Sequence, residues 1–135
     1  MSHQIINPTG LFNSVQYGFS QAVVATGARH VFLSGQVAVD SQESLVAEDM
    51  LGQALAALEN IRLLLSELKE DMSAVVMLRI YIREDANTPE SQDDISKALA
   101  QVFGRQKPAS SWVIVSGLTN PRWLLEIEAQ AVLSS

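Results

Sequence analysis

Apolar residues recur along this chain with two different periods, and each period predicts one type of element. From Val46 to about Leu68 they return every three or four positions, which is the spacing of an amphipathic helix. The same spacing reappears between Ile95 and Phe103. This second stripe follows Thr88-Pro89-Glu90, which supplies an N-cap, a proline at the first helical position and an acid in the first turn. Gly104 is placed to end it, so two helices are predicted.

Between Val75 and Arg83 apolar and polar positions alternate, which predicts a strand with one buried face. The apolar face consists of Leu78, Ile80 and Ile82, and the other face consists of Met77, Arg79, Tyr81 and Arg83. Near the N-terminus, the apolar runs 22–24 and 31–33 are separated by Thr26-Gly27-Ala28-Arg29, which predicts a hairpin.

The last third of the chain predicts two more strands. Residues 108–115 and the stretch from Leu124 are separated by a segment with Gly, Asn and Pro at 117–121, which we interpret as the turn of a hairpin. In the second strand the carboxylates of Glu126 and Glu128 share one face, opposite apolar neighbours. The predicted order is ββαβαββ, which is an α+β fold of one mixed sheet with two helices on one face.

The other face of that sheet remains uncovered by two helices. Met77 and Tyr81 are the apolar or aromatic side chains that we expect there, and Trp112 is one that could lie there. A monomer would expose more apolar surface than is usual, so self-association is predicted.

Length and composition narrow the function classes. A chain of 135 residues with 47% hydrophobic content is expected to form one domain, residues 1–135, with a real core. Neither a long apolar run nor a secretory signal is found, so a cytoplasmic protein without membrane contact is expected. There is no cysteine, and His3 and His30 have no metal-binding spacing, so no metal site is predicted.

The net charge of −6 argues against nucleic acid as a partner, because phosphate binding needs clustered Lys and Arg. The nine cationic residues are scattered along the chain. Neither a Ser/His/Asp arrangement nor a glycine-rich phosphate loop is present. Nuclease activity is therefore not expected.

Three stretches carry a family resemblance: Gly18-Phe19-Ser20-Gln21-Ala22-Val23, Leu33-Ser34-Gly35-Gln36-Val37, and the region from Pro108 to the strand Leu124-Leu-Glu-Ile-Glu-Ala129. Together they resemble the reactive intermediate deaminase family (RidA, also called YjgF-like or L-PSP endoribonuclease-like), over about residues 18–132. The resemblance implies a homotrimer of the bacillus-type chorismate-mutase-like fold, with a pocket at each subunit interface. It further implies cofactor-independent hydrolysis of enamines and imines, such as 2-aminoacrylate, to a keto acid and ammonium. The expected partners are a small-molecule metabolite and further copies of the chain.

The same resemblance assigns candidate site residues. Glu126 stands where the family's glutamate positions or activates water. Ser34 and Gly35 match the family as well, and they are either a strand end whose glycine allows close backbone approach or part of the pocket lining. In the pattern Pro-Ala-Arg-Ser the arginine clamps the substrate carboxylate, but here that position is Ser110. One neutral hydroxyl replaces a bidentate guanidinium, so turnover of small imino acids is expected to be weak.

Two further departures make the expected pocket less polar and differently shaped. Phe19 replaces the tyrosine of Gly-Pro-Tyr-Ser-Gln-Ala, and Trp112 occupies a position where small residues are common. Arg79 is either a salt-bridge partner of Glu126 or Glu128, or a relocated anion clamp. Glu126 is either a structural partner of that arginine or the group that positions water.

These alternatives leave three function classes open. The first is a trimeric metabolite-binding protein with divergent enamine or imine deaminase activity. The second is a non-catalytic ligand-binding or regulatory module, which the changes at Ser110 and Phe19 favour. The third is a chaperone-like protein that acts through exposed apolar surface.

Overall fold

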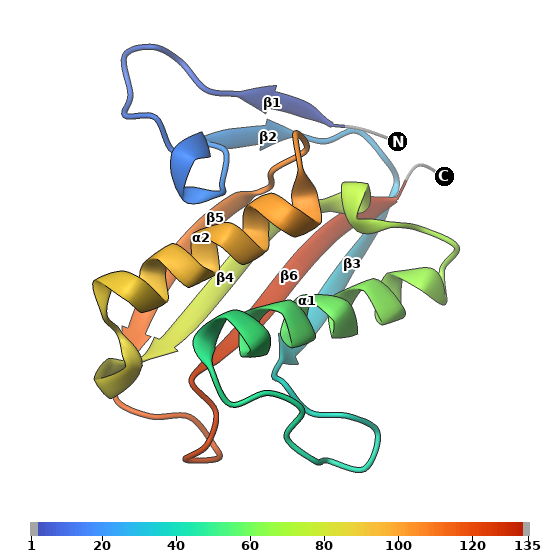
Figure 1. Ribbon diagram of the computed structural model, residues 1–135. Coiled ribbons are helices and arrows are strands. Elements are labelled where there is room, and N and C mark those ends of the chain that lie inside the picture. The colour runs from blue at the N-terminus through green and yellow to red at the C-terminus, as the bar shows by residue number, and fades with distance from the viewer. Residues whose placement is uncertain (1–2, 134–135) are drawn as a thin grey trace.

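The computed structural model describes residues 3–133, and Figure 1 shows the arrangement of their elements. The helices are α1 (Met50–Ser66) and α2 (Pro89–Phe103), with short 3-10 turns η1 (Val15–Tyr17), η2 (Met72–Ala74) and η3 (Glu84–Ala86). The strands are β1 (Gln4–Ile6), β2 (Ala22–Val24), β3 (Arg29–Gln36), β4 (Val75–Arg83), β5 (Ala109–Val115) and β6 (Leu125–Leu133). A three-residue strand, β1, therefore precedes the predicted order.

Four of the strands form a mixed sheet in the order β3-β6-β4-β5. β4 runs parallel to β5, whereas β6 is antiparallel to both β3 and β4. The mixed sheet is confirmed, but both predicted hairpins are wrong. β2 pairs with β1 in a separate two-stranded sheet, and β4 lies between β5 and β6. Turn residues show that the chain changes direction, but they do not show which strands become neighbours.

The predicted helices are present, and their ends follow from capping. Asp49 is the N-cap of α1, and its carboxylate accepts a hydrogen bond from Gly52 N at 3.0 Å. The helix therefore begins at Met50, and not at Val46 as the apolar spacing predicted. Thr88 caps α2 by accepting from Ser91 N at 3.0 Å, with Pro89 in the first turn. Gly104 ends α2 with a φ of 55°, a value that favours glycine.

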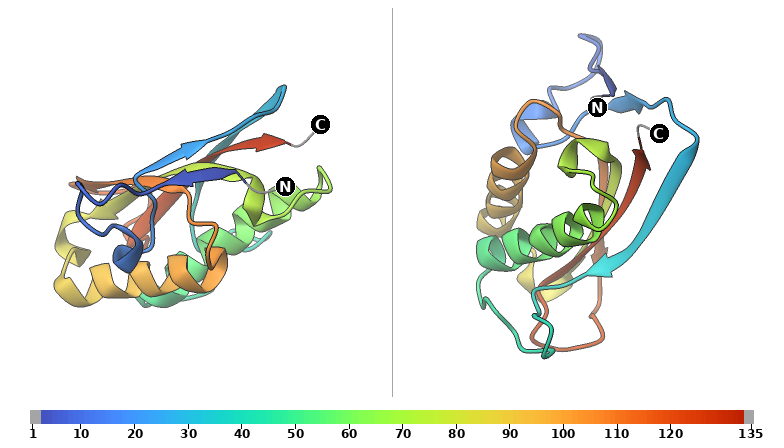
Figure 2. Two further views of the ribbon diagram at one scale, coloured as in Figure 1. Left: turned by 90° about the horizontal axis from the view of Figure 1, so that it is seen from above. Right: turned by 90° about the vertical axis from the view of Figure 1, so that its right-hand side faces the viewer.

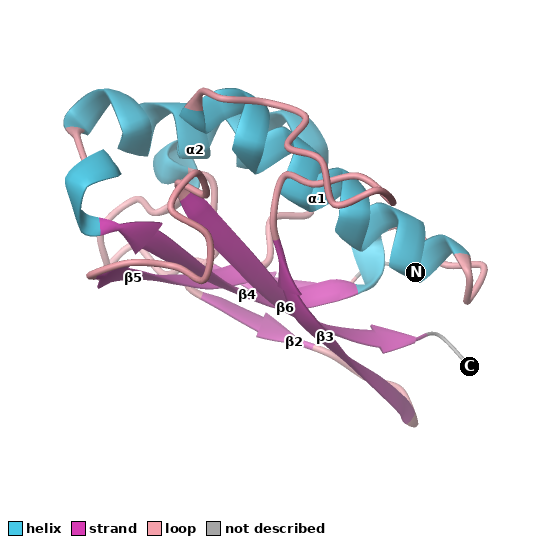
Figure 3. Ribbon diagram, turned by 90° about the horizontal axis from the view of Figure 1, so that it is seen from below, coloured by secondary structure: helices cyan, strands magenta, loops and turns pink. Residues whose placement is uncertain are grey.

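The core lies between the helices and one face of the sheet. Leu78, Ile80 and Ile82 of β4 and their neighbours Leu125 and Ile127 of β6 are fully buried there. They pack against the apolar stripes of α1 and α2, chiefly Leu58, Ile61, Leu65, Ile95 and Leu99. Figures 2 and 3 show both helices on the same side of the sheet, so the predicted α+β layering is confirmed and one sheet face stays open in the single chain.

Candidate functional site

The open face of the sheet carries the polar residues of β4 and β6. Arg79 and Tyr81 project from β4 opposite the core residues, as the alternation predicted. In the register of the sheet, Arg79 pairs with Glu128 and Tyr81 pairs with Glu126. Side chains at paired positions lie about 5 Å apart at Cβ, so these four residues form one polar cluster.

Glu128 is held by two neighbours from β4. Its Oε1 accepts a hydrogen bond from Tyr81 Oη at 2.7 Å and another from Arg79 Nη1 at 2.9 Å. The Tyr81 hydroxyl and the Arg79 guanidinium together lower the pKa of Glu128, because both stabilise its charged form. The same bond raises the pKa of Tyr81, so its phenol stays protonated as a donor. The salt-bridge interpretation of Arg79 is thus confirmed, with Glu128 as its partner.

A hollow of about 150 Å³ lies beside this ion pair on the open face. Its walls come from β3, β4 and β6, namely Phe32, Leu33, Met77, Arg79, Glu128, Ala129 and Gln130. Phe32 is 74% exposed at its rim. An apolar rim around a charged pair is a surface that can receive a ligand or a second subunit.

Glu126 differs from Glu128 in its surroundings. Within residues 3–133 its carboxylate makes no hydrogen bond or ion pair, although it lies on the same face only two residues away. The carboxylate passes over Gly35, where an added Cβ would overlap it. Gly35 sits at an irregularity in the β3–β6 register between Leu33 and Gln36. A bulge and a missing side chain therefore make the space that the Glu126 carboxylate occupies.

Ser34 precedes this glycine on β3 and is exposed. Its carbonyl oxygen accepts a hydrogen bond from Gln36 Nε2 at 3.1 Å. The structure thus brings Gly35 against Glu126, with Ser34 next to it in the chain.

Ser110 and Trp112 lie on the other side of the sheet. They pair with Leu78 and Ile80, so they share the face that the helices cover. Trp112 packs against the core, and the expectation that it adds to the open face is wrong. The reason is the register between β5 and β4. A residue of β5 lies on the same face as the β4 residue with which it pairs, and the sequence does not reveal that pairing.

Both side chains keep an unused polar atom. Ser110 Oγ and Trp112 Nε1 are buried and have no hydrogen-bond partner among the described residues. Such donors are uncommon in folded proteins and call for a partner outside the chain, such as water, ligand or another subunit.

Phe19 lies between η1 and β2, next to a residue that pairs with the start of β5. Its neighbour Ser20 forms a parallel bridge with Ala109 and donates its hydroxyl to Lys107 O at 2.6 Å. The ring of Phe19 meets that of Phe12 edge-on, with centroids 6.3 Å apart. The candidate residues therefore form two groups in one chain: Glu126, Gly35 and Arg79 on the open face, and the β5 group of Phe19, Ser110 and Trp112.

Two polar side chains have structural roles that the sequence pattern did not reveal. Tyr81 was assigned only to a face to be covered, yet it is a hydrogen-bond partner of Glu128. Gln53 lies on the apolar face of α1 and is fully buried. A polar residue between Met50 and Ala54 in an apolar stripe was the signal for such a role.

Residues 3–133 contain no cluster of three or more His, Asp or Glu side chains that could hold a metal ion. No helix in this range has the length and apolar character needed to cross a membrane.

Comparisons with known proteins agree with this fold. Residues 13–133 match the family model described as endoribonuclease L-PSP. The chain is 31% identical over 116 residues to protein DfrA of Myxococcus xanthus, and the match covers 84% of each.

Solved structures give the same result. The chain superposes on YyfB of Yersinia pestis, a protein of unknown function in the Rid family, with a TM-score of 0.90 at 33% identity; the match covers 98% of this chain and all of YyfB (100%). A member of the YjgF/YER057c/UK114 family from Mycobacterium tuberculosis gives a TM-score of 0.66 at 27% identity, over 98% of this chain and 100% of that one. The chain therefore belongs to the endoribonuclease L-PSP family, which includes the Rid and YjgF proteins.

Proposed function

We propose that this protein is a homotrimeric hydrolase of small imines or enamines, and that Glu126 holds the attacking water. The observation that carries this proposal is the contrast between two carboxylates on one strand face. Glu128 is engaged by Arg79 and Tyr81, whereas Glu126 has no partner within residues 3–133 and lies in space left by Gly35. A carboxylate without a hydrogen-bond or ion-pair partner is suited to accept a proton from water.

The chemistry needs no group beyond the substrate, water and this carboxylate. The water oxygen forms a bond to the carbon of a protonated imine, the C=N π electrons move to nitrogen, and Glu126 takes one water proton. The amino alcohol then collapses: Glu126 returns the proton to nitrogen, and the C–N bond breaks as the oxygen lone pair forms the C=O bond and ammonia leaves. The hydroxyl proton passes to Glu126 and from there to ammonia, which gives the carbonyl product and ammonium. An enamine enters the same path after a proton adds to its carbon.

The trimer supports the proposal by completing the site. In one chain Ser110 and Trp112 of the β5 group face the helices, on the opposite side of the sheet from Glu126. A cleft that contains both groups therefore needs a neighbouring subunit. The exposed Phe32, at 74%, and the edge-strand residues Val113 and Ile114, at 36% and 46%, are the apolar surface that such an interface would cover.

The proposed substrate class depends on whether the site has a positive charge that can bind a substrate carboxylate. Ser110 offers a neutral hydroxyl at the family's arginine position, and Arg79 is committed to Glu128. A substrate carboxylate would thus lack a free guanidinium on these elements. We propose that neutral imines are accepted better than small 2-imino acids.

The experiment follows ammonium and carbonyl release from imines and enamines generated in situ. The purified native protein is expected to accelerate release above the spontaneous rate, with neutral imines ahead of 2-aminoacrylate. No acceleration across both classes would remove the hydrolase proposal.

A second function is favoured by the unused donors of Ser110 and Trp112. If the protein only binds a metabolite, these buried groups supply neutral hydrogen bonds, and Glu126 adds a further contact. Saturable binding of an imine without its turnover is the result that this non-catalytic module predicts.

A further inference from the structure

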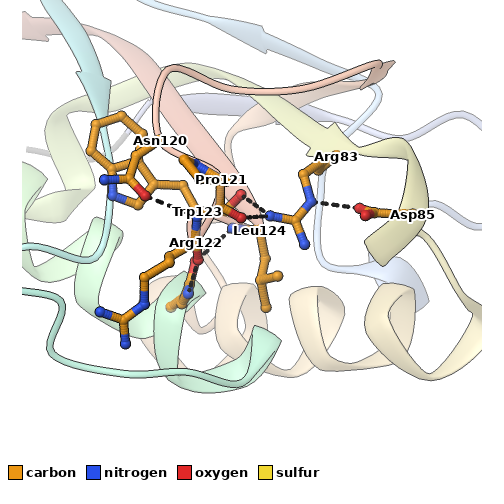
Figure 4. Close-up of polar contacts among 8 residues, drawn as sticks. Arg83, Asp85, Asn120, Pro121, Arg122, Trp123 and Leu124 are labelled. Carbon is orange, nitrogen blue, oxygen red and sulfur yellow. Dashed lines mark hydrogen bonds and ion pairs between the residues drawn. The ribbon is translucent and has the colours of Figure 1, made fainter.

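Two side chains from distant parts of the sequence hold the four residues that precede β6. Arg83, at the end of β4, donates from Nη1 to the carbonyl oxygens of Pro121 and Trp123, the latter at 3.2 Å. Its Nε donates to the Asp85 carboxylate. Figure 4 shows the Arg83 guanidinium between Asp85 and this segment.

Gln53 holds the alternate residues of the same segment. It is fully buried in α1, and its Nε2 donates to Arg122 O at 3.0 Å while its Oε1 accepts from Leu124 N at 2.8 Å. The same amide nitrogen donates to Ala47 O at 3.1 Å, in the loop before α1. Residues 121–124 therefore have main-chain groups bound alternately by Arg83 and Gln53.

This segment determines how β6 begins. Leu124 O accepts from Arg83 N at 3.0 Å, which extends the pairing of β4 with β6, and Glu126 is only two residues further on. In a strand, a slip of one residue turns every side chain to the opposite face. A small change in residues 121–124 would thus move the Glu126 carboxylate out of its place over Gly35.

The contacts restrain a segment that has room to move. A hollow of about 290 Å³ lies beside it, lined by Arg83, Asp85, Ser116, Gly117, Leu118 and Pro121. Without the guanidinium, Pro121 and Trp123 would lose a shared donor and could relax into this space. The Arg83 side chain is only 19% exposed, so it is largely committed to these contacts.

We infer that Arg83 and Gln53 are positioning residues for Glu126, acting through the main chain of residues 121–124. The inference rests on the proposed function, since it assumes that the position of Glu126 matters for turnover. Neither side chain is required to touch the substrate.

Arg83→Met is the test variant, because Gln53 is so deeply buried that its replacement risks misfolding. The matched control is Arg122→Met, which removes one positive charge, as Arg83→Met does. Arg122 belongs to the segment 121–124, but its side chain pairs with Glu48 at 3.0 Å and binds no carbonyl of that segment. Amide hydrogen exchange, the carboxyl ¹³C signal of Glu126 and steady-state kinetics are measured for both variants.

Arg83→Met should speed exchange at the amides of 123–126 and shift the Glu126 signal more than that of Glu128. It should lower kcat by about 10- to 100-fold, the effect of displacing a reacting group by about 1 Å, with KM nearly unchanged. Arg83→Lys should recover part of kcat, because an ammonium can still donate to one carbonyl. Arg122→Met should alter none of these quantities.

Unchanged exchange and an unchanged Glu126 signal in Arg83→Met would overturn the inference. A raised KM with unchanged kcat would also overturn it, since Arg83 would then contact the substrate. If the native protein hydrolyses no imine, the proposed function fails, while the exchange and ¹³C results still decide whether Arg83 positions Glu126.

Discussion

Replacing Gly35 by alanine is predicted to displace the Glu126 carboxylate while leaving the fold intact. A Cβ at this position would overlap Oε2, Cδ and Cγ of Glu126, which belong to a flexible side chain and not to the backbone. Gly35 has no left-handed φ, so alanine introduces no backbone strain there. The change therefore acts on the position of one carboxylate without removing it.

Two quantities should change in Gly35→Ala: the free energy of unfolding, through the rotamer of Glu126, and kcat, through the position of its carboxylate. Moving Glu126 away from its preferred orientation costs about 0.5–1.5 kcal/mol. Alanine in place of glycine regains about 0.4–1 kcal/mol by restricting the unfolded chain. The free energy of unfolding should thus change by no more than about 1 kcal/mol, while a displacement of about 1 Å at the reacting group should lower kcat by about 100-fold.

The assay combines thermal unfolding with imine hydrolysis by Gly35→Ala. Gly10→Ala is the control, because a Cβ at Gly10 meets no atom within 4 Å. The double variant Gly35→Ala/Glu126→Gln should be no slower than Glu126→Gln alone, since both changes act through the same carboxylate. Native turnover in Gly35→Ala would refute the reasoning, as would a double variant slowed by the product of both single effects.

Three other outcomes are expected. Ser110→Arg should raise turnover of 2-aminoacrylate by about 10-fold or more in a coupled keto-acid assay, because charged hydrogen bonds contribute about 1.5–3 kcal/mol each; an unchanged rate would place the substrate carboxylate elsewhere. Because the pKa of Glu128 is lowered, the hydrogen bonds of Glu128 with Tyr81 and Arg79 stabilise the fold above a pH of about 4.5, and this stabilisation is lost as the pH falls through the lowered pKa. The Tm difference between native protein and Tyr81→Phe should therefore shrink under acid. A constant difference across that range would remove Glu128 as its source. Phe32→Glu should shift sedimentation equilibrium from trimer toward monomer, whereas Leu63→Glu on the outer side of α1 should not; a native protein that is monomeric at micromolar concentration would contradict the assembly itself.

Periodicity predicted the elements that are long and regular. The alternation in 75–83 identified β4 with both of its faces, and the capping residues Thr88 and Gly104 identified both ends of α2. These signals are local, because a strand or helix has to place its own apolar side chains on one side. Local signals also identified Glu126 and Glu128 as residues of one face.

The pairing of strands could not be obtained in that way. β4 inserts between β5 and β6, so the turn at 117–121 does not make a hairpin. The same non-local register turns Trp112 toward the helices. The different roles of Glu126 and Glu128 also depend on neighbours from β3 and β4, which no spacing within β6 reveals.

The most direct test of the account compares two substitutions on one strand face. Glu126→Gln should lower kcat for imine hydrolysis by about 100-fold or more, the usual scale for a group that moves a proton, without changing Tm or assembly. Glu128→Gln should lower Tm by weakening its bonds to Arg79 and Tyr81, yet keep most of the turnover. Native turnover in Glu126→Gln, on a substrate that the native protein hydrolyses, would contradict the central claim.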